Sequence, residues 1–182
     1  MLTHLRPALV LTLFFMLLTG LAYPLAMTGI AQVVFPAQAN GSLIVKDGAV
    51  IGSSLIGQSF ATERYFHGRP SAVNYDAATS SGSNLGPSST SLLDQIKERA
   101  AAYGESNVPV DLLTASGSGL DPDVSPAGAL AQVTRVATAR GLAEDQVRSL
   151  VGQHTEGREL GILGEPRVNV LALNLALDQL QK

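Results

Sequence analysis

The feature that most constrains this chain is a long uncharged segment near its N-terminus. Residues 7–45 contain no Asp, Glu, Lys or Arg, and residues 9–35 (LVLTLFFMLLTGLAYPLAMTGIAQVVF) are apolar almost throughout. A bilayer core about 30 Å thick is crossed by roughly 20 apolar residues in a helix, so this run is long enough with residues to spare. Gly20 and Pro24 are tolerated in a membrane helix. The sequence therefore predicts one transmembrane helix over residues 9–35.

The charges that flank this helix predict its orientation. Arg6 and the amino terminus precede it, and the next basic residue is Lys46. The positive-inside rule then places residues 1–8 in the cytoplasm and residues 36–182 outside it, as one extracytoplasmic soluble domain. The alternative is a cleaved signal peptide, because residues 37–39 (AQA) have the small-x-small form of a cleavage site. However, the apolar core of a signal peptide spans only about 7–15 residues.

The remainder of the chain predicts one compact α+β domain. A β-hairpin is expected over residues 42–60, because two β-rich runs flank the turn dipeptide Asp47-Gly48. Residues 61–87 are dense in turn formers and show no clean period, and residues 107–115 are expected to be extended. Apolar spacing and capping residues, among them Ser125 as an N-cap followed by Pro126, predict helices over four ranges: 88–104, 123–141, 142–155 and 169–182. In the last of these, Leu171, Leu175 and Leu177 are expected to face the core.

Composition excludes several classes of function. The chain has 12 Lys and Arg against 15 Asp and Glu, a net charge of −3, which argues against a nucleic-acid partner. The absence of cysteine excludes disulfides, a thiolate metal site and lipid attachment through cysteine. The three histidines, His4, His67 and His154, lack the paired spacing of a metal site. No catalytic constellation is found, because neither Ser/Gly turn described next carries a G-x-S-x-G motif.

Two related Ser/Gly turns are the main candidate site. Residues 80–87 (SSGSNLGP) and residues 115–122 (ASGSGLDP) share five residues in register. Such turns can cradle an anion at the start of a helix, or they can be plain turns and helix caps. They also suit close backbone approach by a partner protein, which is the role predicted here. The candidate docking residues in the turns are Ser81, Gly82, Ser83, Asn84, Ser116, Gly117, Ser118 and Gly119.

Two arginines in irregular stretches complete the candidate docking set. Arg69 and Arg167 are expected either to pair with acids of the same domain or to reach a partner. From the residues alone, the profile is that of a membrane-anchored accessory protein. A free-standing, membrane-anchored periplasmic binding protein for a small anion is the alternative.

Three long blocks of the sequence resemble one known family. Residues 57–87 (GQSFATERYFHGRPSAVNYDAATSSGSNLGP), residues 108–141 (VPVDLLTASGSGLDPDVSPAGALAQVTRVATARG) and residues 164–178 (GEPRVNVLALNLALD) are similar to the hallmark blocks of the C subunit of the Kdp-type potassium-transporting ATPase. The resemblance covers nearly the whole chain, including the N-terminal apolar helix.

The resemblance implies a non-catalytic accessory subunit of an ATP-driven potassium import complex in the bacterial inner membrane. The implied partners are a potassium-channel-like subunit, a P-type ATPase subunit that hydrolyses ATP, a very small membrane subunit and membrane lipid. The family subunit is described as necessary for assembly and as a catalytic chaperone that raises the ATP affinity of the ATPase subunit. The resemblance also implies a nucleotide contact at Gln58. It implies that no cofactor is tightly bound and that the chain meets ATP only through the complex.

The implied nucleotide contact conflicts with the predicted topology. ATP is cytoplasmic, whereas residues after 36 are expected outside. Two interpretations therefore stay open. In one, the outer domain holds the assembly together on the external face and affects ATP affinity indirectly, by stabilising one conformational state. In the other, it binds ATP together with the pump subunit.

Overall fold

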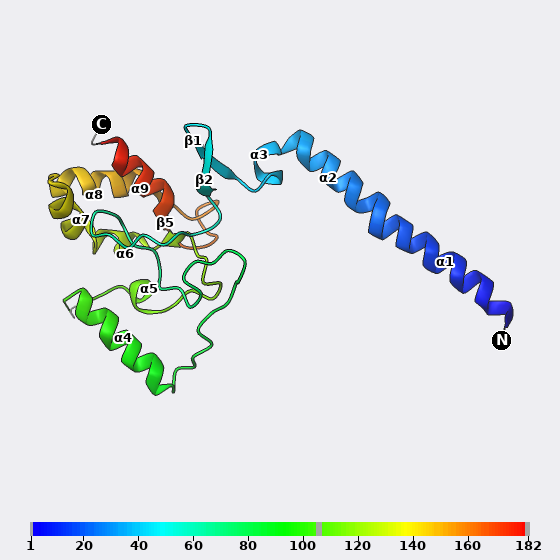
Figure 1. Ribbon diagram of the computed structural model, residues 1–182, viewed down its shortest axis with the longest axis horizontal. Coiled ribbons are helices and arrows are strands. Elements are labelled where there is room, and N and C mark those ends of the chain that lie inside the picture. The colour runs from blue at the N-terminus through cyan, green and yellow to red at the C-terminus, as the bar shows by residue number, and fades with distance from the viewer. Residues whose placement is uncertain (1, 105–106, 181–182) are drawn as a thin grey trace. The chain divides into compact units, whose positions relative to one another are not determined.

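The computed structural model describes residues 2–104 and 107–180, and the chain divides into two compact units, residues 1–51 and 52–182. Figure 1 gives the order of the elements.

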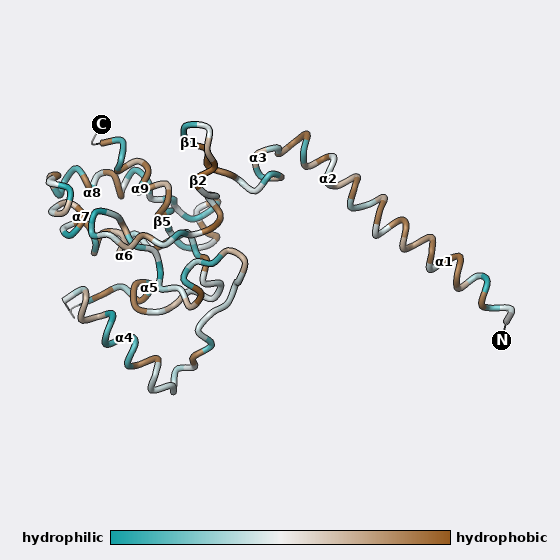
Figure 2. Tube along the Cα trace, viewed as in Figure 1, coloured by the Kyte–Doolittle hydropathy of each residue, from teal (hydrophilic) through white to brown (hydrophobic). Residues whose placement is uncertain are grey.

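The first unit is dominated by one apolar helix. After a 3-10 turn at Leu2–His4, it consists of α1 (Leu5–Leu17), a π-helical turn at Leu18–Ala22 and α2 (Tyr23–Val34). Together these form the 30-residue helix Leu5–Val34, the one helix in the described ranges that is long and apolar enough to cross a membrane. Hydrophobic residues predominate along this helix, with hydrophilic colouring near its N-terminal end and paler residues in between (Figure 2). The helix fits a single membrane span, and it begins four residues before the predicted boundary.

The π-helical turn lies directly before Pro24. A proline ring clashes with the carbonyl four residues earlier, which is here Gly20, inside the π-helical turn. Widening the helix at this point gives the ring room, and the Thr19 hydroxyl donates to Phe15 O at 2.6 Å across the same region. The helix therefore continues past the proline.

The segment that follows the long helix is short and ordered. Phe35 leaves the helical conformation, and α3 (Pro36–Ala39) follows directly. The side-chain amides of Gln32 and Asn40 bond to each other, with Asn40 Nδ2 3.0 Å from Gln32 Oε1. Strands β1 (Leu43–Lys46) and β2 (Ala49–Ser53) then form a two-stranded sheet. Asp47 and Gly48 both have positive φ, as a type I′ turn requires, which confirms the predicted hairpin.

The second unit combines short helices with a small sheet, an α+β fold as predicted. Strands β3 (Asp123–Val124), β5 (Arg167–Asn169) and β4 (Thr155–Glu156) form an antiparallel sheet in that order. Asp123 pairs with Asn169, and Thr155 pairs with Val168. The helices are α4 (Thr90–Ala102), α5 (Val110–Leu113), α6 (Pro126–Leu130), α7 (Val133–Arg140), α8 (Glu144–Gln153) and α9 (Val170–Gln179).

Polar caps set several helix boundaries. Ser89, Ser125 and Asn169 each accept a hydrogen bond through the side chain from a backbone N–H of the first turn, of α4, α6 and α9 respectively. Gly141 ends α7 in the left-handed conformation with φ 67°. These caps confirm Ser125 as the predicted N-cap.

Two predicted elements are wrong in detail. Residues 107–115 are not extended throughout, because Pro109 starts the single helical turn α5, which the Thr114 hydroxyl closes by donating to Val110 O at 2.9 Å. The helix predicted over residues 123–141 begins instead with strand β3 and then divides into α6 and α7. The capping Ser125 follows the strand directly, so strand and helix share this short stretch.

The core lies between α6–α9 and the sheet. Its fully buried apolar side chains come from α6–α9, from β5 and from one residue of the irregular segment: Phe66, Ala129, Val133, Val136, Val147, Val168, Leu173 and Leu177. In α9, the prediction that Leu175 faces the core is wrong, because it is only half-buried. The buried face instead carries Leu173 and the polar Asn174.

The irregular segment 61–87 has no helix or strand, yet the core holds its first part in place. Five consecutive carbonyl groups, those of residues 63–67, each accept a hydrogen bond from a side chain of α7, α9 or the residue before α7. The donors, in order along the segment, are Arg135, Arg140, Arg135, Asn174 and Gln132, at 2.6–3.1 Å.

The two amide side chains among these donors also accept. Phe66 N donates to Asn174 Oδ1 at 2.9 Å, and His67 N donates to Gln132 Oε1 at 2.8 Å. Asn174 and Gln132 are both buried, so each amide pairs with a peptide group much as a neighbouring strand would.

Candidate functional site

The two related Ser/Gly turns contact each other. Ser81 N donates to Ser118 O at 2.9 Å, and the Ser80 hydroxyl donates to the same carbonyl at 3.1 Å. A Cβ added at Gly82 would lie 3.0 Å from Gly117 O, so the backbones approach closely at this point. Nothing in the repeat itself indicates that one copy packs on the other. We call residues 80–84 and 115–119 the paired turns.

The second turn is built into the domain. Ser116 is buried, its hydroxyl accepts from Gly119 N at 2.9 Å, and its N–H donates to Pro70 O at 3.0 Å. Gly119 has φ 69°, and a Cβ there would lie 2.7 Å from Ser81 O. The Ser71 hydroxyl donates to Gly119 O at 2.7 Å. Ser116 and Gly119 therefore support the turn from inside.

The remaining predicted docking residues divide by exposure. Ser81, Gly82 and Ser83 are half-buried by the pairing. Asn84, Gly117 and Ser118 are exposed. The surface that the paired turns offer to a partner therefore consists of these last three residues and the exposed Ser80.

The anion cradle considered for the second turn has its donors occupied. The turn leads into strand β3, and the start of α6 is capped by Ser125, whose hydroxyl accepts from Gly128 N at 2.9 Å. Asp111 adds a carboxylate there, because its Oδ2 accepts from Ser125 N at 2.6 Å. A carboxylate of the chain itself thus takes the place of an anion. At the first turn, Ser89 caps α4.

Arg69 pairs within the domain, directly beneath the second turn. Its Nη1 lies 3.1 Å from Asp121 Oδ2, and its carbonyl accepts from the Tyr75 hydroxyl at 2.5 Å. Burial raises the pKa of Tyr75 to about 12, with the negative charge of Asp121 adding to the effect. These contacts fix the end of the second turn to the irregular segment.

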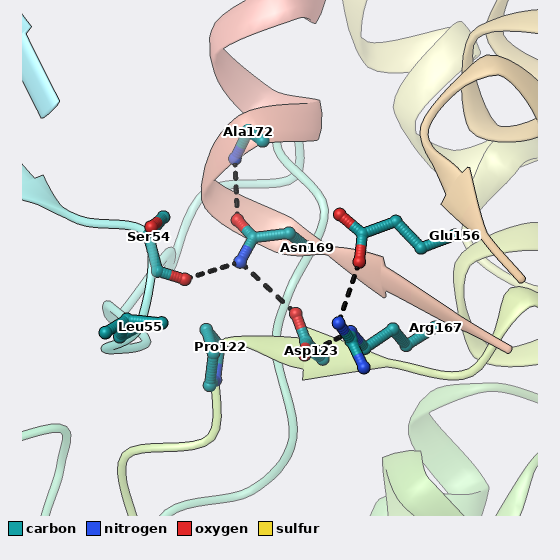
Figure 3. A pocket seen from close by; sticks show the side chains of 8 residues that line it. All are labelled: Ser54, Leu55, Pro122, Asp123, Glu156, Arg167, Asn169 and Ala172. Atoms are coloured by element: carbon teal, nitrogen blue, oxygen red, sulfur yellow. Dashed lines mark hydrogen bonds and ion pairs between the residues drawn. The ribbon is translucent and has the colours of Figure 1, made fainter. Parts of the chain in front are cut away.

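Arg167 pairs with acids from two neighbouring strands of the sheet (Figure 3). Its guanidinium lies 3.4 Å from Asp123 and 3.0 Å from Glu156, and Glu159 is 3.9 Å away. Burial raises the pKa of Asp123, although the positive charge of Arg167 opposes the shift.

Arg167 and Asp123 separate two clefts. The larger, of about 380 Å³, is the one drawn in Figure 3, where Asn169 Nδ2 donates to Ser54 O at 2.9 Å and to Asp123 Oδ1 at 3.2 Å. The smaller, of about 270 Å³, is also lined by Arg69, so the two candidate arginines meet at one cleft. Around the smaller cleft, four acids, Asp111, Asp121, Asp123 and Glu165, face the two arginines. This surface is suited to charged side chains of a partner.

Gln58 lies elsewhere, against the backbone of Gly52. A Cβ added at Gly52 would overlap Gln58 Nε2 and would lie 3.0 Å from Leu171 Cδ2. Gln58 is half-buried and is not among the residues that line either cleft. Within residues 2–104 and 107–180, no group of three or more His, Asp or Glu side chains is arranged to hold a metal ion.

Comparison with known proteins gives the family. The family model described as "K+-transporting ATPase, c chain" matches residues 5–179. The chain belongs to this family, KdpC. It is 61% identical to the potassium-transporting ATPase KdpC subunit of Rhodopseudomonas palustris (strain BisB5), with 98% of each chain covered. It is 56% identical to the KdpC subunit of Methylorubrum populi over the full length of both chains, and 61% identical to that of Sorangium cellulosum over 98% of each.

The KdpC family match includes every element of the candidate site. The apolar helix, the paired turns and both clefts all lie between residues 5 and 179. By family, the chain is therefore a KdpC subunit of a potassium-transporting ATPase. Its long apolar helix fits a single-pass subunit of a membrane transporter complex.

Proposed function

We propose that this chain is the accessory subunit that assembles and stabilises an ATP-driven potassium import complex of the bacterial inner membrane. The observation that carries the proposal is the match to KdpC subunits over at least 98% of their length. Potassium conduction and ATP hydrolysis belong to other subunits, a channel-like one and a P-type ATPase, and a very small membrane subunit completes the complex.

The long apolar helix anchors the subunit, with residues 1–8 in the cytoplasm and the domain from residue 36 on the extracytoplasmic side. Arg6 in the first turn of the helix supports this orientation, because the apolar run is followed by no basic residue until Lys46.

The paired turns and the cleft of Arg69 and Arg167 form a docking surface for the other subunits. The turns are rigid, because backbone bonds join one to the other and the second to the irregular segment. Rigid backbone with small side chains loses little conformational entropy on binding, which favours its use at an interface.

The effect on ATP affinity that the family resemblance implies is indirect in this proposal. A domain outside the cytoplasm meets no ATP, so it acts by stabilising one conformation of the complex. The position of Gln58 supports this, because its side chain packs on Gly52 and not at a cleft. Substituting Gln58 is then expected to change the stability of the domain and the assembly of the complex. It is not expected to remove a nucleotide contact.

Cysteine labelling of intact cells tests the topology. The chain has no native cysteine, so a single cysteine at the exposed Ser118 is a clean probe, with one at Thr3 as the inside control. A membrane-impermeant maleimide is expected to label residue 118 and not residue 3. Labelling of residue 3 alone would show that the topology is the reverse of the one proposed. Direct nucleotide binding would then be the function to test.

Co-purification tests the assembly role. A tagged chain, extracted in mild detergent from membranes that contain the whole ATPase, is expected to recover the other subunits. Recovery of the chain alone, with the ATPase intact without it, would contradict the proposal and would favour a free-standing binding protein.

A further inference from the structure

A short hairpin loop between β4 and β5 presents apolar side chains to solvent. Glu159 and Leu163 form an isolated antiparallel bridge, in which each N–H donates to the other's carbonyl at 2.9 Å. The loop between them consists of Leu160, Gly161 and Ile162. We call residues 159–163 the apolar hairpin loop.

The apolar hairpin loop is held in one shape before anything binds it. Besides the two bridge bonds, Gly161 N donates to Arg158 O at 3.1 Å. At its base Arg158 Nη2 donates to both carboxylate oxygens of Glu165, at 2.9 and 2.7 Å. A loop that is already ordered binds with little further entropy loss.

Its apolar side chains are largely exposed to solvent. Leu160 is 89% exposed, Ile162 is 76% exposed and Leu163 is 53% exposed. Single exposed apolar residues are common on protein surfaces, but a contiguous group at a loop tip indicates an interaction site.

The backbone at the tip is also strained. Leu160 has φ 52°, a left-handed conformation that a branched side chain adopts only at a cost. The neighbouring left-handed positions, Gly161 and Gly164, carry glycine, for which this conformation is unstrained. Because the side chain of Leu160 lies in solvent, no packing within the domain offsets the strain. Strain that is retained without an internal benefit indicates a functional constraint.

The charges around the loop favour a protein as the occupant over a lipid surface. Glu156, Glu159 and Glu165 are all exposed, and the nearby Arg158 and Arg167 are already paired with them. Segments that lie on membranes carry Lys, Arg and aromatic residues, which bind anionic headgroups and the interface. Residues 156–167 contain no Lys and no aromatic residue, and their net charge is negative. With three Glu against two Arg, the rim of the apolar tip keeps a net negative charge, which complements an apolar pocket with a basic rim.

We propose that the apolar hairpin loop inserts Leu160 and Ile162 into an apolar pocket rimmed by Lys or Arg on the extracytoplasmic face of another subunit of the ATPase. This inference rests on the proposed function, which supplies both the partner and the side of the membrane. It adds a docking site separate from the paired turns.

Substitution at the tip separates docking from folding. Leu160→Asn removes the apolar side chain and places in the left-handed conformation a residue that tolerates it. In the full-length chain, Leu160→Asn is expected to unfold at the same temperature as the wild-type chain or at a higher one. The double variant Leu160→Asn, Ile162→Ser should recover about ten-fold less of the other subunits on co-purification. The matched control is Val110→Ser, because Val110 is 70% exposed on α5, away from the loop in sequence. Full recovery with the double variant, or an equal loss with the control, overturns the inference.

Photo-crosslinking identifies the occupant. A benzophenone amino acid at residue 162, in membranes that contain the assembled ATPase, is expected to crosslink to another subunit. Crosslinks only to lipid, only to a second copy of the chain, or to nothing overturn the inference while the complex itself remains intact. If instead the wild-type chain recovers no ATPase subunit, the proposed function fails first, so the two failures are distinguishable.

Discussion

Two irregular segments of the domain place their apolar side chains in opposite environments, one in the core and one in solvent. In residues 63–67, Phe66 is fully buried and every carbonyl accepts a hydrogen bond from a side chain of α7, α9 or the residue before α7. In the apolar hairpin loop, Leu160 is almost fully exposed, and the backbone bonds only to its own neighbours. The first segment is thus held by the rest of the fold, and the second is held by itself with its apolar side chains left available. Substitutions in the two segments should therefore affect different measurements, stability in one and assembly in the other.

The largest expected effect is at Asn174. Asn174→Ala removes both hydrogen bonds to Phe66 and leaves a buried peptide N–H and C=O without partners, so the free energy of unfolding should fall by about 2–4 kcal/mol. Urea unfolding of the full-length chain in detergent measures it. Gln153→Ala, which removes an exposed amide on α8, is the control and should change stability by less than about 0.5 kcal/mol. Equal effects would mean that the buried amide does not hold the segment.

The paired turns offer a graded test within one surface. At Gly119 a side chain meets both positive φ and Ser81 O, so Gly119→Ala should lower the free energy of unfolding by about 1–3 kcal/mol. Gly82→Ala should have an intermediate effect, because its Cβ would be 3.0 Å from Gly117 O. Gly117→Ala should be near neutral for stability, because no atom lies within 4 Å of its added Cβ. Thermal unfolding of the three variants should follow this order, and any other order would contradict the pairing.

The pH dependence of stability tests the burial of His67 in the first segment. Burial lowers its pKa below 6.5 in the folded chain, and the positive charge of Arg135 adds to the effect. Between pH 6.5 and that lowered pKa, the unfolded chain binds more protons. The free energy of unfolding should therefore fall as the pH falls through this window, by at most about 1.4 kcal/mol per pH unit, and should not depend on His67 above it.

His67→Gln removes this titration and is the comparison for the pH series. The variant should show a flatter dependence than the wild-type chain between pH 7 and pH 5. An identical slope in both proteins would show that the imidazole is protonated as easily in the folded chain as in the unfolded one.

The smallest expected effect is a gain in stability at the apolar hairpin loop. Leu160→Gly relieves the left-handed strain and should raise the free energy of unfolding by up to about 1 kcal/mol, or leave it unchanged where the greater freedom of glycine in the unfolded chain offsets the gain. Thermal unfolding measures it. A marked loss of stability would mean that Leu160 packs within the domain, and the contrast between the two segments would disappear.

Local signals in the sequence predicted much of the fold. Asp47-Gly48 specified the β1–β2 turn, Ser125 and Pro126 specified the start of α6, and Gly141 specified the end of α7. Each of these acts within a few residues, through turn geometry or a capping bond, so it can be recognised without the rest of the chain. The helix α5 was missed because a single turn of helix has too few residues to show a period.

The candidate site was predicted only in its parts. The paired turns, Arg69 and Arg167 were each selected from the sequence, but the contacts that bring them together join residues 35 or more positions apart, and no local pattern specifies them. The apolar hairpin loop was not selected, because its Leu and Ile residues look like those of a buried strand until the fold leaves them exposed. Asn174 was also missed, because a polar residue between leucines gives no indication that it is buried.

The sequence by itself determined that the chain has a long apolar helix, a mostly helical α+β domain and family membership, because these depend on composition, on short-range periodicity and on residues in fixed order. Tertiary structure alone decided which polar side chains are buried and which apolar ones are exposed. The physical reason is that burial depends on what packs against a residue. Phe66 lies in the core because Asn174, 108 positions away, bonds to its backbone there, whereas Leu160 lies in solvent because no element of the domain covers it.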